Sequence, residues 1–162
     1  MPPVEAANSP SFLSKLAVEC AAWQAMLNVM TEEEQALVNG EADHLARLNA
    51  SKLAQLNTLS NLAGARNNAL LAAGLSADHI GMNVWLTQHG QPEHRSQWQR
   101  LCEMEQQAQA MNLRIGKLIE MRLANTRQAL NVLIHSTTNK GGLYDQAGQS
   151  VAGHSGKPLT AA

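Results

Sequence analysis

Residues 16–37 read LAVECAAWQAMLNVMTEEEQAL, and the spacing within this stretch decides the fold class. Seven residues in it are separated alternately by four and three positions, and we call this row of residues the seam of the helix: Leu16, Cys20, Trp23, Leu27, Met30, Glu34 and Leu37. Such a heptad repeat places its apolar members along one side of an α-helix. We expect this helix over 11–39, with a length of about 43 Å at 1.5 Å per residue. A rod of that length needs a partner helix of similar length to cover its apolar side.

An Asn-Gly pair interrupts the pattern directly after this segment. Asn39-Gly40 is followed by a second leucine-rich segment, which we expect to be helical over 41–73. Glycine is common just past helix ends because it reaches positive φ without a side-chain clash. So short a connection predicts that the two helices form an antiparallel hairpin.

Two further helices are expected downstream, a short one over 77–88 and a long one over 93–135. Pro92 suits the first turn of the long helix. That helix carries its own seam with three-four spacing, and four seam positions are polar: Glu105, Asn112, Arg122 and Thr126. Polar residues at such positions weaken a core but can fix its register.

The two ends of the chain lack this periodicity. We expect residues 1–10 to be a disordered arm and residues 136–162 a flexible tail, since neither can form a core. Composition supports helices between them, with 25 Ala and 22 Leu against 7 Val and 4 Ile. Leucine and alanine suit helices, whereas β-branched residues suit strands. The sequence therefore predicts an all-α protein, an elongated antiparallel bundle of three long helices plus one shorter helix over 11–135.

Charge and hydropathy exclude several classes of protein. The net charge of -1 gives no basic field for nucleic acid, and the arginines of the last helix are interleaved with acids. No apolar run approaches the roughly 20 residues of a membrane helix, and the N-terminus does not resemble a signal peptide. Cys20 and Cys102 form no CxxC motif, so we expect free buried thiols and a cytosolic protein.

Residue patterns typical of catalysis are weak throughout the sequence. The six histidines have no Cys or carboxylate partners at metal-ligand spacing. Glu32, Glu33 and Glu34 are consecutive, so on a helix they point in different directions and are expected to form a solvated acidic face. No glycine-rich phosphate loop and no nucleophile with a neighbouring base stand out. We therefore expect no catalytic residue, no metal site and no cofactor.

The remaining class of function is binding to another protein, and the last long helix is the candidate binding segment. Three methionines accompany its polar seam: Met104, Met111 and Met121. Methionine side chains repack easily, which suits a surface that exchanges partners. The same residues would equally serve to close the bundle, and the pattern alone leaves both readings open.

Three segments share motifs with one known family. The first is EEQALVNGEADHL at 33–45, with Lys52 and Arg66 after it. The second joins Met111-Asn112, GKLIE at 116–120 and NTRQALNVL at 125–133, and the third is LYDQAGQS at 143–150. Over roughly 12–150 they resemble the flagellar export chaperones of the FlgN type. The third segment is the most specific, although Asp145 stands where family members often have glycine.

The resemblance implies a cytosolic, non-catalytic chaperone of flagellar type III export. Such proteins bind the C-terminal helical ends of two hook–filament junction proteins, prevent their premature association and deliver them to the cytoplasmic domain of the export gate's membrane subunit. It implies no nucleic acid and no membrane insertion, and leaves homo-oligomerisation of the free chaperone open. The implied substrate-binding candidates lie in the last long helix: Ile115, Leu118, Ile119, Met121, Leu130, Leu133 and Ile134.

The implied gate-docking residues are Leu143 and Tyr144, in the segment after the last helix. Tyr144 is the single tyrosine of the chain. An aromatic held outside a core makes a good anchor in a partner's pocket, although it can also fold back on the bundle. Two other classes remain open, a generic coiled-coil adaptor or structural protein and a helical nucleic-acid-binding protein.

Overall fold

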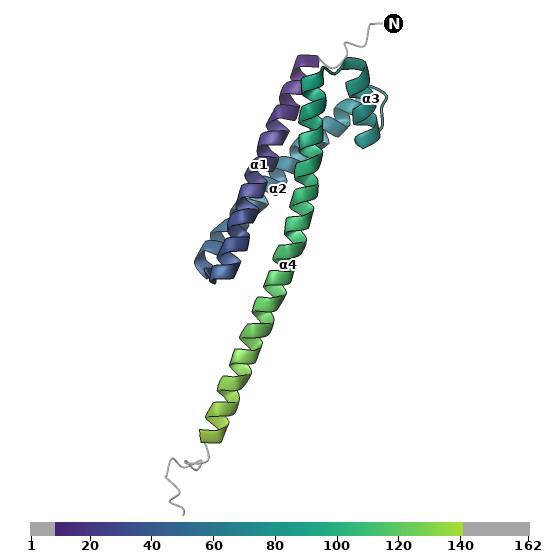
Figure 1. Ribbon diagram of the computed structural model, residues 1–162. Coiled ribbons are helices and arrows are strands. Elements are labelled where there is room, and N and C mark those ends of the chain that lie inside the picture. Colours follow the sequence, from purple (N-terminus) through teal and green to yellow (C-terminus); the bar gives the residue numbers. More distant parts are fainter. Residues whose placement is uncertain (1–8, 141–162) are drawn as a thin grey trace, which may run out of the picture. The chain divides into compact units, whose positions relative to one another are not determined.

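The computed structural model describes residues 9–140, and side chains from Phe12 to Thr138. This range holds four helices and no strand (Figure 1): α1(Ser9–Asn39), α2(Ala42–Ala72), α3(His79–His89) and α4(Pro92–Lys140). The predicted all-α helical bundle is confirmed. The chain divides into two parts, residues up to Ile119 and residues from Glu120 onwards.

The connection between α1 and α2 is the tight turn expected at Gly40. Gly40 has a φ of 75°, in the left-handed region that glycine adopts without a steric penalty. The N–H of Glu41 donates to the carbonyl of Ala36 at 3.0 Å and so closes the end of α1. The two helices therefore run antiparallel, which places Glu33 of α1 against Lys52 of α2 at 2.7 Å.

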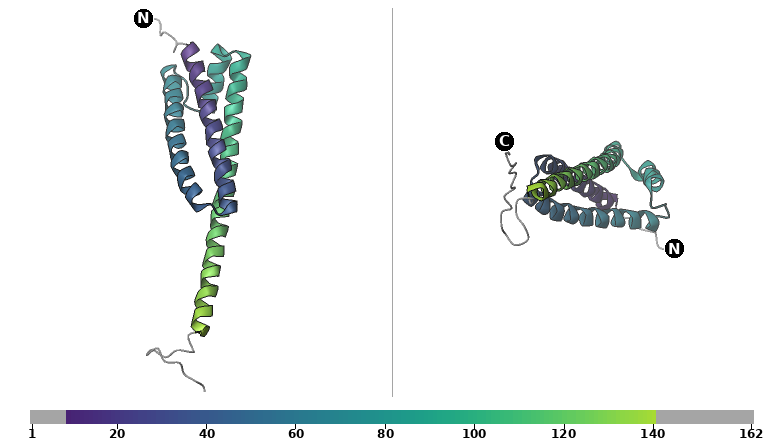
Figure 2. Two further views of the ribbon diagram at one scale, coloured as in Figure 1. Left: turned by 90° about the vertical axis from the view of Figure 1, so that its left-hand side faces the viewer. Right: turned by 90° about the horizontal axis from the view of Figure 1, so that it is seen from below.

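Helix α3 lets the first part of α4 run in the same direction as α1. Asp78 caps α3 by accepting a hydrogen bond from the N–H of Gly81 at 2.8 Å. Cys20 of α1 then contacts the Gln97 carbonyl at 3.4 Å. Further along, Glu34 of α1 meets Arg114 at 3.1 Å, so positions in the two helices advance together (Figure 2). The order is therefore up-down-up, with α2 antiparallel to both neighbours.

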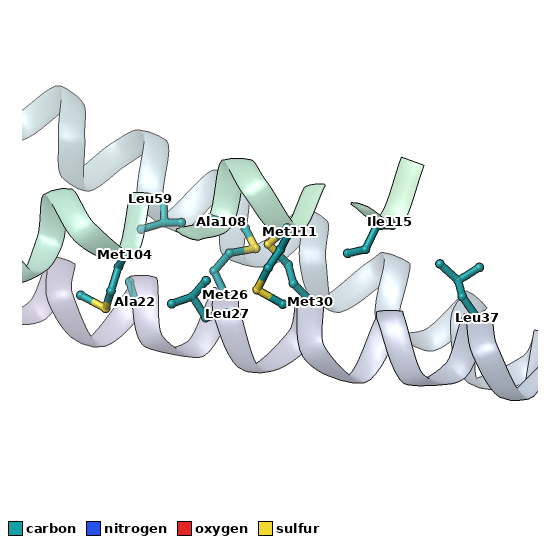
Figure 3. Packing of buried hydrophobic residues seen from close by; sticks show 10 residues of the cluster. All are labelled: Ala22, Met26, Leu27, Met30, Leu37, Leu59, Met104, Ala108, Met111 and Ile115. Carbon is teal, nitrogen blue, oxygen red and sulfur yellow. The ribbon is translucent and has the colours of Figure 1, made fainter. Parts of the chain in front are cut away.

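Two apolar clusters hold the part up to Ile119. A methionine-rich cluster joins α1, α2 and α4 (Figure 3): Ala22, Met26, Leu27, Met30, Leu37, Leu59, Met104, Ala108, Met111 and Ile115. An aromatic cluster packs α3 against the ends of α1, α2 and α4: Phe12, Leu16, Leu70, Met82, Trp85, Leu86, Trp98 and Leu101. The rings of Phe12 and Trp85 lie 4.4 Å apart, and the Trp98 indole donates to Asn83 at 3.2 Å.

The acidic triplet at 32–34 is not the solvated face that the sequence predicted. Glu33 is only 12% exposed where it pairs with Lys52, and Glu34 accepts two hydrogen bonds from Arg114. Consecutive helical residues do point in different directions, as expected. In a three-helix arrangement, however, two of those directions face the other helices.

Helix α4 is longer than its apolar pattern predicts. We expected it to end at about 135 and a flexible tail to begin at 136, and that boundary is wrong because α4 continues to Lys140. The hydroxyls of Ser136, Thr137 and Thr138 donate to helix carbonyls three or four residues earlier, at 2.8–3.1 Å. These bonds keep the hydroxyls satisfied within the helix without any apolar periodicity.

Candidate protein-binding surface

The second part of α4 exposes apolar side chains along its whole described length. Every side chain from Glu120 to Thr138 is exposed. The large apolar residues among them are 49–64% exposed: Met121, Leu123, Leu130, Val132, Leu133 and Ile134. Exposed apolar patches on soluble proteins mark interaction sites.

Helix geometry divides these residues between two sides. With about 100° between successive residues, Leu123, Leu130, Leu133 and Ile134 fall on one side of α4. Two threonines share that side, and we call the six residues the distal stripe: Leu123, Thr126, Leu130, Leu133, Ile134 and Thr137. Met121 and Val132 lie on the opposite side of the helix.

Both threonine hydroxyls of the distal stripe already donate hydrogen bonds within α4. Thr126 donates to the carbonyl of Arg122 at 2.9 Å. Thr137 donates to the carbonyls of Leu133 and Ile134 at 3.1 and 2.8 Å. Because both hydroxyls are already paired, burial of the stripe by a partner would leave no threonine hydroxyl unsatisfied.

The substrate-binding candidates expected from sequence separate in the structure. Ile115 is 2% exposed and belongs to the methionine-rich cluster, while Leu118 is partly buried against that cluster. Ile119 is exposed, and Met121 lies opposite the distal stripe. Leu130, Leu133 and Ile134 belong to the stripe itself. The expected set therefore joins core residues and surface residues.

Leu123 is a stripe residue that the sequence analysis missed. It is 51% exposed and lies four residues after Ile119 and seven before Leu130. That spacing follows the same helical side, so the signal was present in the sequence. The gate-docking candidates Leu143 and Tyr144 lie outside the described residues.

The methionines of α4 divide in the same way. Met104 and Met111 are 5% and 4% exposed and belong to the methionine-rich cluster. They therefore close the bundle and do not form a surface for exchangeable partners. Met121, at 62% exposure, is a surface residue.

Two of the polar seam residues of α4, Glu105 and Asn112, line a groove between α1, α2 and α4. It encloses about 400 Å³, and Trp23, Met26 and Met30 contribute its apolar side. Glu105 and Asn112 line it together with Lys52 and Gln109. Glu105 is partly exposed and Asn112 is exposed, so neither polar side chain is buried in the core.

The two cysteines lie partly inside the bundle. Cys20 and Cys102 are free, as expected, but only partly buried, and this burial raises the pKa of both thiols. A raised pKa lowers the thiolate fraction and with it the nucleophilicity. Among the described residues, no group of three or more His, Cys, Asp or Glu side chains is placed to hold a metal ion. No described helix combines the length and hydropathy that crossing a membrane requires.

Comparison with known proteins gives one family. The family model described as FlgN protein matches residues 8–152, which is most of the chain. No curated protein and no solved structure matches the chain.

Proposed function

Because the chain belongs to the FlgN family of flagellar export chaperones, we propose that it binds the C-terminal helical ends of two hook–filament junction proteins. The family is a chaperone family and not an enzyme family. In our proposal the chain acts in the cytoplasm, keeps both substrates from premature association and delivers them to the export gate.

The distal stripe is the observation that carries this proposal. A disordered amphipathic segment can fold as it lays its apolar side along an exposed helix. Leu123, Leu130 and Leu133 are each about half-exposed or more and supply an apolar surface without unsatisfied hydroxyls beside them. Burial of such a surface against a substrate helix would provide the driving force for binding.

Delivery would use the segment after α4. We assign gate docking to Leu143 and Tyr144, on the resemblance of LYDQAGQS at 143–150 to the family motif. A tyrosine presents a large apolar ring with a polar tip, which suits a pocket on a partner. Substrate and gate would then contact different segments of the same chain.

Substrate binding is tested with matched double variants on the two sides of α4. Leu123→Asp/Leu130→Asp places charges in the distal stripe, and Met121→Asp/Val132→Asp places the same charges on the opposite side. Each variant is co-purified with each junction protein, and circular dichroism checks its helix content. We expect the stripe variant to lose both substrates and the control to retain them. Retention by both variants, or equal loss by both, contradicts this surface.

Gate docking has its own test. Tyr144→Ala is measured for binding to the cytoplasmic domain of the gate subunit, with substrate binding as the control. We expect weaker gate binding and unchanged substrate binding. If gate affinity does not change, the docking assignment is wrong. If neither junction protein co-purifies with the unmodified chain, a generic coiled-coil adaptor becomes the better account.

A further inference from the structure

The distal stripe lies in a positively charged stretch of α4. From 120 to 140 the sequence contains three basic residues, Arg122, Arg127 and Lys140, against a single acidic one, Glu120. With about 100° per residue, Arg122 and Arg127 fall on the two borders of the stripe, one on each side. A helix that covers the stripe would therefore have a cationic side chain along each of its edges.

The chain itself contains an example of a helix that packs against α4. Helix α1 covers part of α4 in the bundle, and it carries Glu19, Glu32, Glu33 and Glu34 against a single Lys15. Glu34 accepts two hydrogen bonds from the Arg114 guanidinium, at 3.1 and 3.3 Å. An acidic residue at the edge of an apolar contact thus meets an arginine of α4.

We infer that the distal stripe selects an amphipathic helix whose apolar side is bordered by carboxylates. The inference rests on the proposed function and narrows its substrate class. Carboxylates would face Arg122 and Arg127 while leucine or isoleucine side chains cover Leu123, Leu130 and Leu133. Lysine or arginine at the same borders would place like charges together, which disfavours the wrong partner.

The test uses two synthetic helical peptides with the same leucine and isoleucine seam. One carries Glu and the other Lys at the positions that border the seam, and fluorescence anisotropy measures their binding to the full chain. We expect the Glu peptide to bind more tightly by roughly tenfold at low salt, because exposed ion pairs contribute modestly. The difference should shrink as added salt screens the charges.

Charge reversal on the chain provides the matched control. Arg122→Glu/Arg127→Glu should reverse the order of the two peptides. Lys15→Glu/Arg47→Glu changes the net charge equally at exposed positions of α1 and α2 and should leave the order unchanged. Both double variants are checked for helix content by circular dichroism.

Several outcomes overturn the inference: equal affinities, tighter binding of the Lys peptide, no binding of either peptide, or the same effect from both double variants. The proposed function fails separately. If the junction proteins bind through the distal stripe but the peptides show no charge preference, the function stands and the inference falls. If the Glu peptide is preferred but the junction proteins do not bind, the inference stands and the assigned substrates are wrong.

Discussion

The carboxylate of Glu19 on α1 accepts a hydrogen bond from the guanidinium of Arg66 on α2, inside the bundle. Only 2% of Glu19 is exposed. Among the residues that the structure describes, it is the charged residue that is buried in the core. Arg66 also lies over the Trp98 ring of α4, with 5.0 Å between the guanidinium carbon and the ring centroid. These two contacts of Arg66 therefore link all three long helices.

Removal of one partner of this pair should cost more than removal of both. Glu19→Ala leaves the Arg66 charge largely buried, and we expect the free energy of unfolding to fall by about 3 kcal/mol. The double variant Glu19→Met/Arg66→Met removes both charges and should lose much less. Urea unfolding followed by circular dichroism measures both. A double variant at least as unstable as Glu19→Ala would show that the pair contributes net stability.

The stability of the protein should also depend on the ionisation of Glu19. Burial raises the pKa of its carboxyl above the ordinary value of 4.5, although Arg66 opposes the shift. The folded state then holds the proton more tightly than the unfolded state, so stability falls as the pH rises from below 4.5 through the folded-state pKa. Glu19→Gln lacks this titration. We expect the stability of the unmodified chain relative to Glu19→Gln to decrease across that pH window, and a constant difference would contradict the raised pKa.

Gly81 and Gly64 should respond in opposite ways to alanine. A Cβ at Gly81 would overlap the backbone carbonyl of Ser76, so Gly81→Ala must displace the start of α3 and should cost about 2 kcal/mol or more. A Cβ at Gly64 meets nothing within 4 Å in the middle of α2, and Gly64→Ala should add about 0.5–1 kcal/mol. Thermal unfolding of both variants measures the difference. Similar effects of the two substitutions would rule out the close approach at Gly81.

The fold was readable from local periodicity, and the electrostatic contacts were not. The seam from Leu16 to Leu37 and the Asn-Gly turn determine the hairpin through short-range geometry. The partners of Glu33 and Glu34 depend on how α1 faces two other helices, which their own spacing does not encode. The end of α4 was missed because residues 136–140 carry no apolar periodicity, although the helix continues through them.

The candidate surface was predicted in part. Heptad spacing identifies the apolar side of α4, which includes both Ile115 and Leu130. It does not show which of these residues are buried by other helices, because those contacts join residues that are far apart in the sequence. Ile115 is therefore a core residue although it has the same pattern as the stripe residues. Met121 was expected as one of the methionines beside the polar seam, whereas a criterion based strictly on one side of the helix selects Leu123 instead.

The different positions of Ile115 and Leu130 lead to opposite expectations for stability and binding. Ile115→Ala removes a side chain that is 2% exposed and leaves a cavity in the methionine-rich cluster, so it should lower the free energy of unfolding by about 3 kcal/mol. Leu130 is 55% exposed, and Leu130→Ala should change stability by no more than about 0.5 kcal/mol. Substrate affinity, measured under conditions in which both variants are folded, should fall for Leu130→Ala and remain near the original value for Ile115→Ala. Loss of affinity confined to Ile115→Ala would move the substrate surface from the distal stripe into the bundle.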